Sequence, residues 1–152
     1  MLKKTAYYNE MLALVDKAID ELKKIEFDTY TVSIWTDFNA CLSAFSIDSE
    51  GNSINRVAIL NKFYEEFNKP RYLGRNYSPA DFELRNFILI TNQSFEENWE
   101  ENSKGKCWEE VEPILKEIGE YAFDKIKQLP IHKDFELGVN GRSDWYEFSW
   151  KL

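Results

Sequence analysis

Residues 29–47 read TYTVSIWTDFNACLSAFSI, and this stretch predicts the class of fold. Side chains in residues 30–35 alternate with a period of two, which is typical of a half-buried strand. The tetrapeptide TDFN at residues 36–39 is typical of a turn. Residues 40–47 then carry small and apolar side chains on both faces, as a central strand does. The stretch therefore predicts two consecutive strands of one sheet.

An amphipathic helix is predicted in residues 1–22, ahead of the first strand. Apolar side chains recur there every three or four positions and form one stripe, while most charged side chains lie off it. The stripe comprises Tyr8, Met11, Leu12, Val15, Ala18, Ile19 and Leu22. This spacing indicates a helix that buries one side.

Residues 48–91 predict two more helices and a strand. A polar loop at residues 48–53 precedes a helix at residues 54–68, whose apolar positions have helical spacing. Ser78 and Pro79 predict a short helix, because serine caps helix starts and proline suits the first helical position. Residues 85–91, RNFILIT, then predict a buried strand.

Two helices are predicted after that strand. Ser94 and Glu97 have the spacing of a capping box, which marks a helix start. The next helix is predicted at residues 110–128, where Pro113 is tolerated in the first turn. Gly119 lies in the middle of this helix, where glycine costs about 1 kcal/mol relative to alanine. We therefore expect the helix to approach a strand closely at Gly119.

The C-terminal sequence predicts a β-hairpin. A two-residue turn at residues 140–141 and a four-residue loop at residues 140–143 both direct the same side chains to each face. We expect the longer loop, which pairs Leu137 with Tyr146 and keeps Asp144 at the loop edge. The apolar face of the last strand would then comprise Tyr146, Phe148, Trp150 and Leu152.

These elements predict a single α+β domain spanning residues 1–152. We expect a mostly antiparallel sheet with helices packed chiefly on one face. The 5 Trp, 8 Tyr and 11 Phe residues indicate a core rich in aromatic side chains.

The charge balance restricts the partners that this chain can bind. With 27 acidic and 19 basic residues, the net charge is −8. Such a protein repels phosphate backbones and anionic membrane surfaces on average, so we expect neither nucleic acid nor membrane as a partner. A basic protein partner is compatible with this charge. The oligomeric state does not follow from the sequence.

The cysteines and the N-terminal sequence predict a cytoplasmic protein. Cys41 and Cys107 are the only cysteines and form no CxxC motif, which favours a reducing compartment. The longest apolar run near the N-terminus is MLALV at residues 11–15, too short for a signal core or a spanning helix.

Motifs that mark catalysis are not found in the sequence. His132 is the only histidine, and its place after Pro130 favours a surface or capping role. Phosphate-binding loops, nucleophile elbows and zinc-ligand spacings are all missing. We therefore expect no metal, no cofactor and no catalytic residue, and a protein that works by binding.

Residues 94–113, SFEENWEENSKGKCWEEVEP, form the first candidate binding segment. Seven glutamates against two lysines give it a net charge of −5, a large share of the total. Such a field attracts a basic partner, and exposed tryptophans would anchor that partner. The candidate residues are Glu97, Trp99, Glu100, Glu101, Trp108 and Glu109. The alternative is that the aromatic side chains point inward and the glutamates form an ordinary solvated helix surface.

Residues 71–84, RYLGRNYSPADFEL, form the second candidate. This loop is basic and aromatic within an acidic chain, and the helix start that follows it can receive an anion. The candidate ligand-binding residues are Asp37, Arg71, Tyr72, Arg75, Tyr77 and Asp81. The alternative is that the arginines pair with local acids such as Asp81 and Glu83 while the tyrosines pack.

Two short motifs carry a family resemblance. The strand that ends in Thr36-Asp37 and the segment NYSPADFEL with Pro79, Ala80 and Asp81 resemble a family of small bacterial domains. Members of that family are associated with the immunity proteins of polymorphic toxin systems. The resemblance implies a cytoplasmic protein that neutralises a cognate toxin by binding it, and it brings no catalytic residues.

Two functional hypotheses follow. The first is a non-catalytic immunity protein that binds a basic toxin through the acidic and aromatic segment. The second is a sensor module that binds a small molecule or peptide in a preformed pocket near the Arg71–Asp81 loop.

Overall fold

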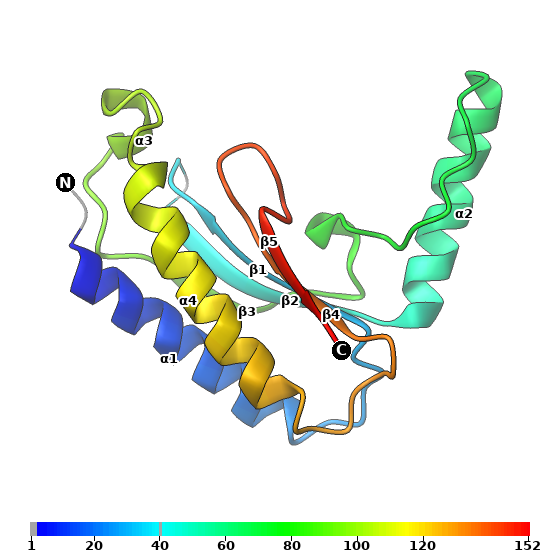
Figure 1. Cartoon of the computed structure of the whole chain (residues 1–152), viewed down its shortest axis with the longest axis horizontal. Helices are drawn as coiled ribbons and strands as arrows, with labels where there is room; N and C mark the ends of the chain where they lie inside the picture. The colour runs from blue at the N-terminus through cyan, green and yellow to red at the C-terminus, as the bar shows by residue number, and fades with distance from the viewer. Residues whose placement is uncertain (1–2, 40) are drawn as a thin grey trace.

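The computed structural model describes residues 3–39 and 41–152, which form a five-stranded sheet and its helices. One long helix precedes the first strand, a second follows the first strand pair, and a third precedes the last strand pair (Figure 1). The elements in chain order are α1 (Lys4–Leu22), β1 (Thr31–Asp37), β2 (Leu42–Asp48), α2 (Glu50–Glu66), η1 (Pro79–Asp81), β3 (Leu84–Thr91), α3 (Trp99–Asn102), α4 (Trp108–Ile126), β4 (Glu136–Val139) and β5 (Phe148–Lys151).

The sheet has the strand order β3-β2-β1-β4-β5 and is mostly antiparallel, as predicted. β1 pairs with β2 across the predicted turn, with Ile34 opposite Phe45. The exception is the parallel pair of β1 with β4, in which Ile34 lies opposite Val139. β1 is therefore the central strand, and nearly all its residues are buried rather than only half of them. This burial explains its run of Val, Ile and small polar residues.

α1 and α4 pack side by side on one face of the sheet, which confirms the predicted single-domain α+β arrangement (Figure 1). The strands contribute alternate residues to this interface, among them Val32 and Ile34 of β1. The hydroxyls of Tyr7 in α1 and Thr36 in β1 hydrogen-bond at 2.7 Å inside the core. α1 buries Met11, Val15, Ala18, Ile19 and Leu22 of the predicted stripe, but Tyr7 and Leu14 are fully buried where Tyr8 and Leu12 were predicted, and those two are only half-buried. The side chains buried in α4 include Val111, Leu115, Ile118, Ala122 and Ile126.

α2 begins one turn earlier than predicted and does not join the core. Ser49 caps it by accepting a hydrogen bond from the Asn52 N–H at 3.1 Å, so the polar stretch after β2 is helical. Among its residues only Ser53 is buried. The helix instead projects from the sheet, away from α1 and α4 (Figure 1). The helical spacing of its apolar residues therefore predicts the helix correctly, but these residues are not buried.

The capping box predicted at Ser94 is wrong. α3 is a single turn that begins at Trp99, after Asn98 in a left-handed conformation with φ 58°. The Ser94 hydroxyl is buried and has no hydrogen-bond partner among the described residues. Gly105 adopts φ 80° between α3 and α4, a left-handed conformation that suits glycine.

The hairpin forms, but in a different register from both predicted ones. Leu137 lies opposite Trp150, and Val139 lies opposite Phe148, so residues 140–147 form the connection. The shift is an even number of residues, which keeps Phe148 and Trp150 on the predicted face. Tyr146 lies outside β5, where its ring occupies the space that a Cβ on Gly138 would fill.

Gly119 lets α4 approach the sheet closely, as its position in the helix predicted. A Cβ on Gly119 would overlap the Trp150 ring of β5 and come within 3.0 Å of Val139 Cγ1. The sheet therefore packs against the helix backbone at this point. Any side chain larger than hydrogen requires the indole to move.

We predict that Gly119→Ala destabilises the fold by about 1–3 kcal/mol, because it overpacks the contact with Trp150. Gly51→Ala is the matched control in α2, since a Cβ there meets nothing within 4 Å. It should be neutral or stabilise by about 0.4–1 kcal/mol. Urea denaturation followed by circular dichroism measures both. Equal effects of the two substitutions would contradict the close approach.

Candidate functional site

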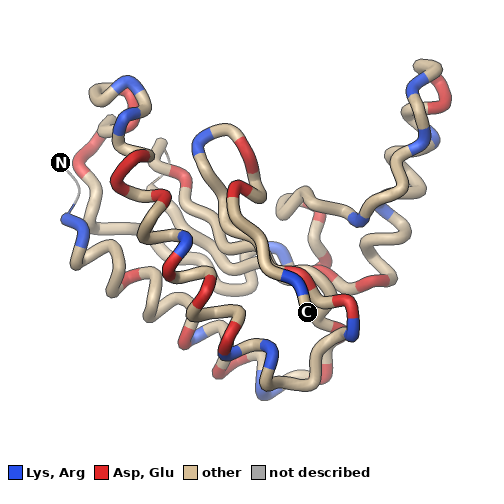
Figure 2. Tube along the Cα trace, viewed as in Figure 1, with Lys and Arg blue, Asp and Glu red and all other residues tan. Residues whose placement is uncertain are grey.

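The acidic cleft is a hollow of about 270 Å³ at the end of β1. It lies between the start of α4 and residues 140–145 of the β4–β5 connection. Its lining residues are Thr36, Asp37, Phe38, Asn39, Glu100, Trp108, Asn140, Gly141, Arg142, Ser143, Asp144 and Trp145. Figure 2 shows acidic positions on both sides of it, at the start of α4 and on the connection.

The Asn140 side chain holds the connection beside β1. Its Oδ1 accepts the Thr36 N–H at 2.9 Å, and its Nδ2 donates to the Thr36 carbonyl at 3.0 Å. This amide continues the parallel pairing of β1 and β4 for one more residue. The Gly141 N–H then donates to the Asp144 carbonyl at 2.8 Å and closes the turn. The wall of the cleft is therefore built from buried hydrogen bonds.

Carboxylates outnumber cations around the cleft. Asp37, Glu100 and Asp144 line it, and Arg142 is the basic residue among the lining side chains. Two further glutamates border the connection at Gly141, where a Cβ would come within 2.9 Å of Glu112 Oε1 and of Glu147 Cβ. Arg142 Nε lies 4.0 Å from Glu100, in an ion pair whose arginine side chain is half exposed. The remaining excess of negative charge favours a cationic ligand.

Trp99 and Trp108 are buried, which corrects their prediction as exposed anchors of a partner. Both indoles pack edge-on against Phe38, with ring centroids 5.4 and 5.0 Å away. Phe95 lies on the same phenylalanine at 4.2 Å. Trp108 Nε1 donates to Glu100 Oε2 at 3.1 Å and so directs that carboxylate. Trp108 therefore positions Glu100 and contributes to the lining of the cleft, whereas Trp99 lies among the core side chains.

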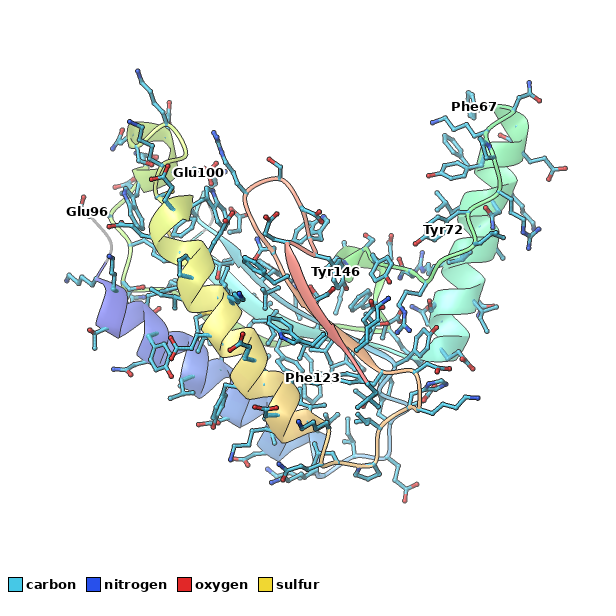
Figure 3. The ribbon with its side chains drawn as sticks, in the orientation of Figure 1. Phe67, Tyr72, Glu96, Glu100, Phe123 and Tyr146 are labelled. Carbon is cyan, nitrogen blue, oxygen red and sulfur yellow. The ribbon has the colours of Figure 1, made fainter. Side chains whose placement is uncertain are left out.

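The acidic residues of this segment face several directions. Glu100 faces the β4–β5 connection, whereas Glu96 lies on the outer side of the molecule (Figure 3). Glu110 turns toward α1, where its Oε1 lies 3.7 Å from Lys4 Nζ. The other predicted residues, Glu97, Glu101 and Glu109, are exposed. Of the predicted set, Glu100 is therefore the one glutamate that lines the cleft, and Trp108 is the one tryptophan.

Trp145 is an exposed aromatic side chain that sequence reasoning missed. It lines the cleft, is 50% exposed, and packs edge-on against Trp35 at 6.2 Å. The predicted hairpin with a loop at residues 140–143 places Trp145 inside its second strand. A tryptophan directly after the polar run GRSD was the signal of an exposed loop position.

The second candidate loop is anchored to the sheet by Arg75. Its Nε lies 2.8 Å from Glu136 Oε2, and the two side chains are 12% and 3% exposed. Its remaining nitrogens donate to the carbonyls of Tyr30 and Asp134 and to Thr31 Oγ1 at 2.7–3.1 Å. The guanidinium also stacks over the Tyr30 ring, 3.9 Å from its centroid. Arg75 is therefore satisfied by the fold itself.

Other predicted residues of the loop have structural partners as well. The Tyr77 hydroxyl donates to Glu136 Oε2 at 2.7 Å, and the Tyr72 hydroxyl donates to the Arg75 carbonyl at 2.7 Å. Asp81 lies 3.8 Å from Arg56, and Arg71 is exposed. Two hollows of about 440 and 480 Å³ flank the loop, so the concave surface that a ligand needs is present.

Asp37 does not join the second candidate site. It ends β1, whereas Arg75 contacts Tyr30 and Thr31 at the beginning of that strand. A seven-residue strand separates the two by about 20 Å. The structure therefore assigns Asp37 to the acidic cleft.

Three ionisable groups near these sites, Tyr77, Tyr146 and Cys107, have a raised pKa that favours their neutral forms. Burial and the neighbouring Glu136 carboxylate raise the pKa of Tyr77 well above its ordinary value. Burial likewise raises the pKa of Tyr146, with a further contribution from Glu136. Burial also raises the pKa of the Cys107 thiol, which makes it a weaker nucleophile at neutral pH. None of these three shifts favours proton transfer or nucleophilic attack near neutral pH.

His132 lies in a cluster with Glu50 and Asp134, whose potential metal-binding atoms are all within 4.8 Å of one another. Its Nδ1 accepts the Asp134 N–H at 2.9 Å. The proton of a neutral imidazole is therefore on Nε2, which lies 3.1 Å from Glu50 Oε2. A metal on Nε2 would need that position deprotonated. The geometry thus fits a capping role for His132 better than a metal site.

Comparisons with protein-family models, with curated proteins and with solved structures found no match. Among the helices of residues 3–39 and 41–152, none is both long and apolar enough to cross a bilayer. The chain is therefore an α+β domain with an acidic cleft and a half-exposed tryptophan at the edge of that cleft.

We predict that Arg75→Met destabilises the protein by about 3–5 kcal/mol, because it leaves the buried Glu136 carboxylate without its main cation. Arg71→Met in the same loop is the control, and its effect should stay within about 0.5 kcal/mol because Arg71 is exposed. Chemical denaturation gives both values. A mild Arg75→Met effect would show that the ion pair does not anchor the loop.

Proposed function

We propose that this protein binds a basic protein partner through the acidic cleft. The observation that carries the proposal is the combination of clustered carboxylates with a half-exposed tryptophan at the rim. Asp37, Glu100 and Asp144 line the hollow, and Trp145 stands beside them. Tryptophan is common among the residues that dominate binding energy, and a charged surface accelerates encounter.

The cleft suits a projecting lysine or arginine side chain. A hollow of about 270 Å³ receives a side chain or a short loop more readily than a drug-sized molecule. The Trp145 face also attracts a cation, since an indole ring is the best aromatic partner for one. Because Asn140 and Phe38 hold the two walls, little ordering is required on binding.

We further propose that the partner is a bacterial toxin and that binding neutralises it in the cytoplasm. The resemblance of Thr36-Asp37 and Pro79-Ala80-Asp81 to the immunity-associated family supports this assignment. The net charge of −8 also supports a basic target, such as a nuclease that binds nucleic acid. Inhibition by contact needs no catalytic group.

Ligand binding beside the Arg71–Asp81 loop is the second candidate function. The two hollows that flank this loop favour it. It ranks second because Arg75 and Tyr77 are already bonded to Glu136 within the fold and are not free to bind a ligand. A ligand there would rely on Arg71, Lys151 and the apolar side of α2.

The first prediction from this function is a stoichiometric complex with the toxin encoded beside this chain. Isothermal titration calorimetry should give a one-to-one complex, and co-expression should protect cells from the toxin. The affinity should fall as salt rises, because the interface pairs opposite charges. If calorimetry detects no binding heat and co-expression gives no protection, the assignment of that partner is contradicted.

The second prediction concerns the charges in the cleft. Glu100→Gln with Asp144→Asn removes two charges and keeps oxygen acceptors for the Trp108 and Tyr146 N–H groups. We expect affinity to fall about 10–100-fold, mainly through slower association and with weaker salt dependence.

The control for this variant is Glu117→Gln with Glu120→Gln, two exposed positions of α4 outside the cleft. It carries the same change in net charge and should leave affinity within about twofold of wild type. Equal losses in the two variants would assign the effect to total charge and exclude the cleft as the binding site.

A further inference from the structure

The basic hollow is the space of about 440 Å³ between α2 and the end of the sheet where β1 and β4 begin. One wall of it is α2 from Ser53 to Asn61. A second wall is the return segment, residues 67–74, which turns back along α2 (Figure 1). Tyr30, Glu136 and Lys151 complete the hollow on the side of the sheet.

Hydrogen bonds within the fold hold these walls in place. Asn61 joins α2 to the return segment, because its Oδ1 accepts the Tyr72 N–H at 2.8 Å and its Nδ2 donates to the Tyr72 carbonyl at 3.0 Å. At the other end of the α2 wall, Ser53 Oγ accepts the Asn76 N–H at 2.8 Å. The hollow therefore exists before a ligand binds, which lowers the entropy cost of binding.

The charge of the basic hollow is opposite to that of the whole chain. Arg71, Arg75 and Lys151 line it together with the carboxylate of Glu136. Three cations and one carboxylate give the lining a net charge of +2, whereas the chain carries −8. Acidic side chains from neighbouring parts of the sequence do not line the hollow: Glu50, Glu65, Glu66 and Asp134.

Within the described residues, Arg71 is a cation of the hollow whose side chain has no hydrogen bond and no ion pair. Arg75 and Lys151, by contrast, are both bonded to Glu136, at 2.8 and 3.2 Å. Arg71 is also exposed, so its guanidinium is accessible to a ligand. A guanidinium binds a carboxylate or a phosphate through two parallel N–H groups. Arg71 therefore favours an anionic group.

Apolar side chains line the same hollow as Arg71. Ile54 of α2 is 62% exposed, and Leu73 of the return segment is 86% exposed. Val57 and Ala58 extend the apolar wall along α2. These side chains present apolar surface to water that the apolar part of a ligand would cover. The hollow thus combines an unpaired cation with apolar walls.

We infer that the basic hollow binds a small organic anion, in which a carboxylate or a similar group is carried on an apolar body. The inference rests on the second candidate function and narrows its ligand to one chemical class. The anionic group binds Arg71, and the apolar body lies against Ile54 and Leu73. A neutral molecule gains nothing from Arg71, and a cation is repelled by the net charge of the lining. A volume of about 440 Å³ suits a ligand at the lower end of the drug-sized range.

An NMR titration of isotope-labelled protein at neutral pH tests the inference with three probes of equal chain length: octanoate, octanol and octylammonium. Octanoate should shift the amide resonances of residues 53–61 and 71–75 until the site is saturated. Octanol should bind about three- to tenfold more weakly, and octylammonium more weakly still, because only the carboxylate pairs with Arg71. Equal affinities of octanoate and octanol overturn the inference.

Substitutions then assign the two parts of the ligand. Arg71→Gln should weaken octanoate about three- to tenfold and change octanol by less than about twofold. Lys62→Gln is the matched control, since Lys62 is an exposed cation of α2 that does not line the hollow, and it should change neither affinity. Leu73→Ala should weaken both probes alike, because it removes apolar surface and no charge. An Arg71→Gln variant that binds octanoate like the wild type overturns the inference.

A pair of peptides distinguishes two sources of the anion. Acetyl-Ala-Leu-Leu with a free C-terminal carboxylate presents the same chemistry as octanoate, and its C-terminal amide does not. If the free-carboxylate peptide binds more tightly than octanoate and its amide does not bind, the ligand is a protein C-terminus. If octanoate binds more tightly, the ligand is a free organic acid.

The outcomes separate this inference from the functions proposed above. If no probe shifts the residues that line the hollow, the second candidate function fails together with the inference. If octanol binds there as tightly as octanoate, ligand binding is supported and the anionic class is wrong. The double variant Glu100→Gln with Asp144→Asn should bind octanoate like the wild type, because neither residue lines the basic hollow. Failure of the acidic cleft to bind a basic partner is therefore a separate result.

Discussion

The buried ion pair between Arg75 and Glu136 is the interaction that holds the segment after α2 against the sheet. Glu136 begins β4, and removing a carboxylate from water costs several kcal/mol unless partners compensate. Arg75, the Tyr77 hydroxyl and Lys151 Nζ supply that compensation at 2.8, 2.7 and 3.2 Å. Arg75 and Tyr77 follow α2 and its return segment, residues 67–74, in the chain. Their bonds to the buried Glu136 carboxylate therefore also hold this part of the chain against the sheet. A hydrophobic residue at position 136 would pack well but would remove the ion pair that holds the segment after α2 against the sheet.

The opposite end of β4 fixes the acidic cleft. Asn140 follows the strand and binds the Thr36 backbone through both side-chain groups, which sets the β4–β5 connection opposite α4. β4, which lies beside β1, therefore holds the segment after α2 at one end and the acidic cleft at the other. About 20 Å of sheet separates these two regions, so a partner in the cleft does not contact α2. The paired strands fix the distance between the two regions.

Local patterns in the sequence predicted the strands and the core helices, because those depend on periodicity and on neighbours in the chain. The period of two in residues 30–35 located β1, although both faces of that strand are buried, and the helical spacing in residues 1–22 located α1 and most of its buried side chains. Contacts between residues far apart in the chain could not be predicted from these local patterns. The hairpin register depends on Tyr146 covering Gly138 and Trp150 covering Gly119, contacts that no turn motif encodes. Trp99 and Trp108 were ambiguous because an aromatic residue beside two glutamates has the same spacing whether it points inward or outward. Phe38, more than fifty residues earlier, decides the matter by packing against both.

The distribution of charge distinguishes the acidic cleft from α2 and the residues that follow it. Residues 54–74 hold four cations, Arg56, Lys62, Lys69 and Arg71, against the two acids Glu65 and Glu66. The excess of negative charge therefore resides in the rest of the molecule, including the cleft (Figure 2). A basic partner approaching from solution is drawn toward the cleft rather than toward residues 54–74, since long-range fields act before any contact forms. The half-exposed Trp145 side chain would then supply affinity after encounter.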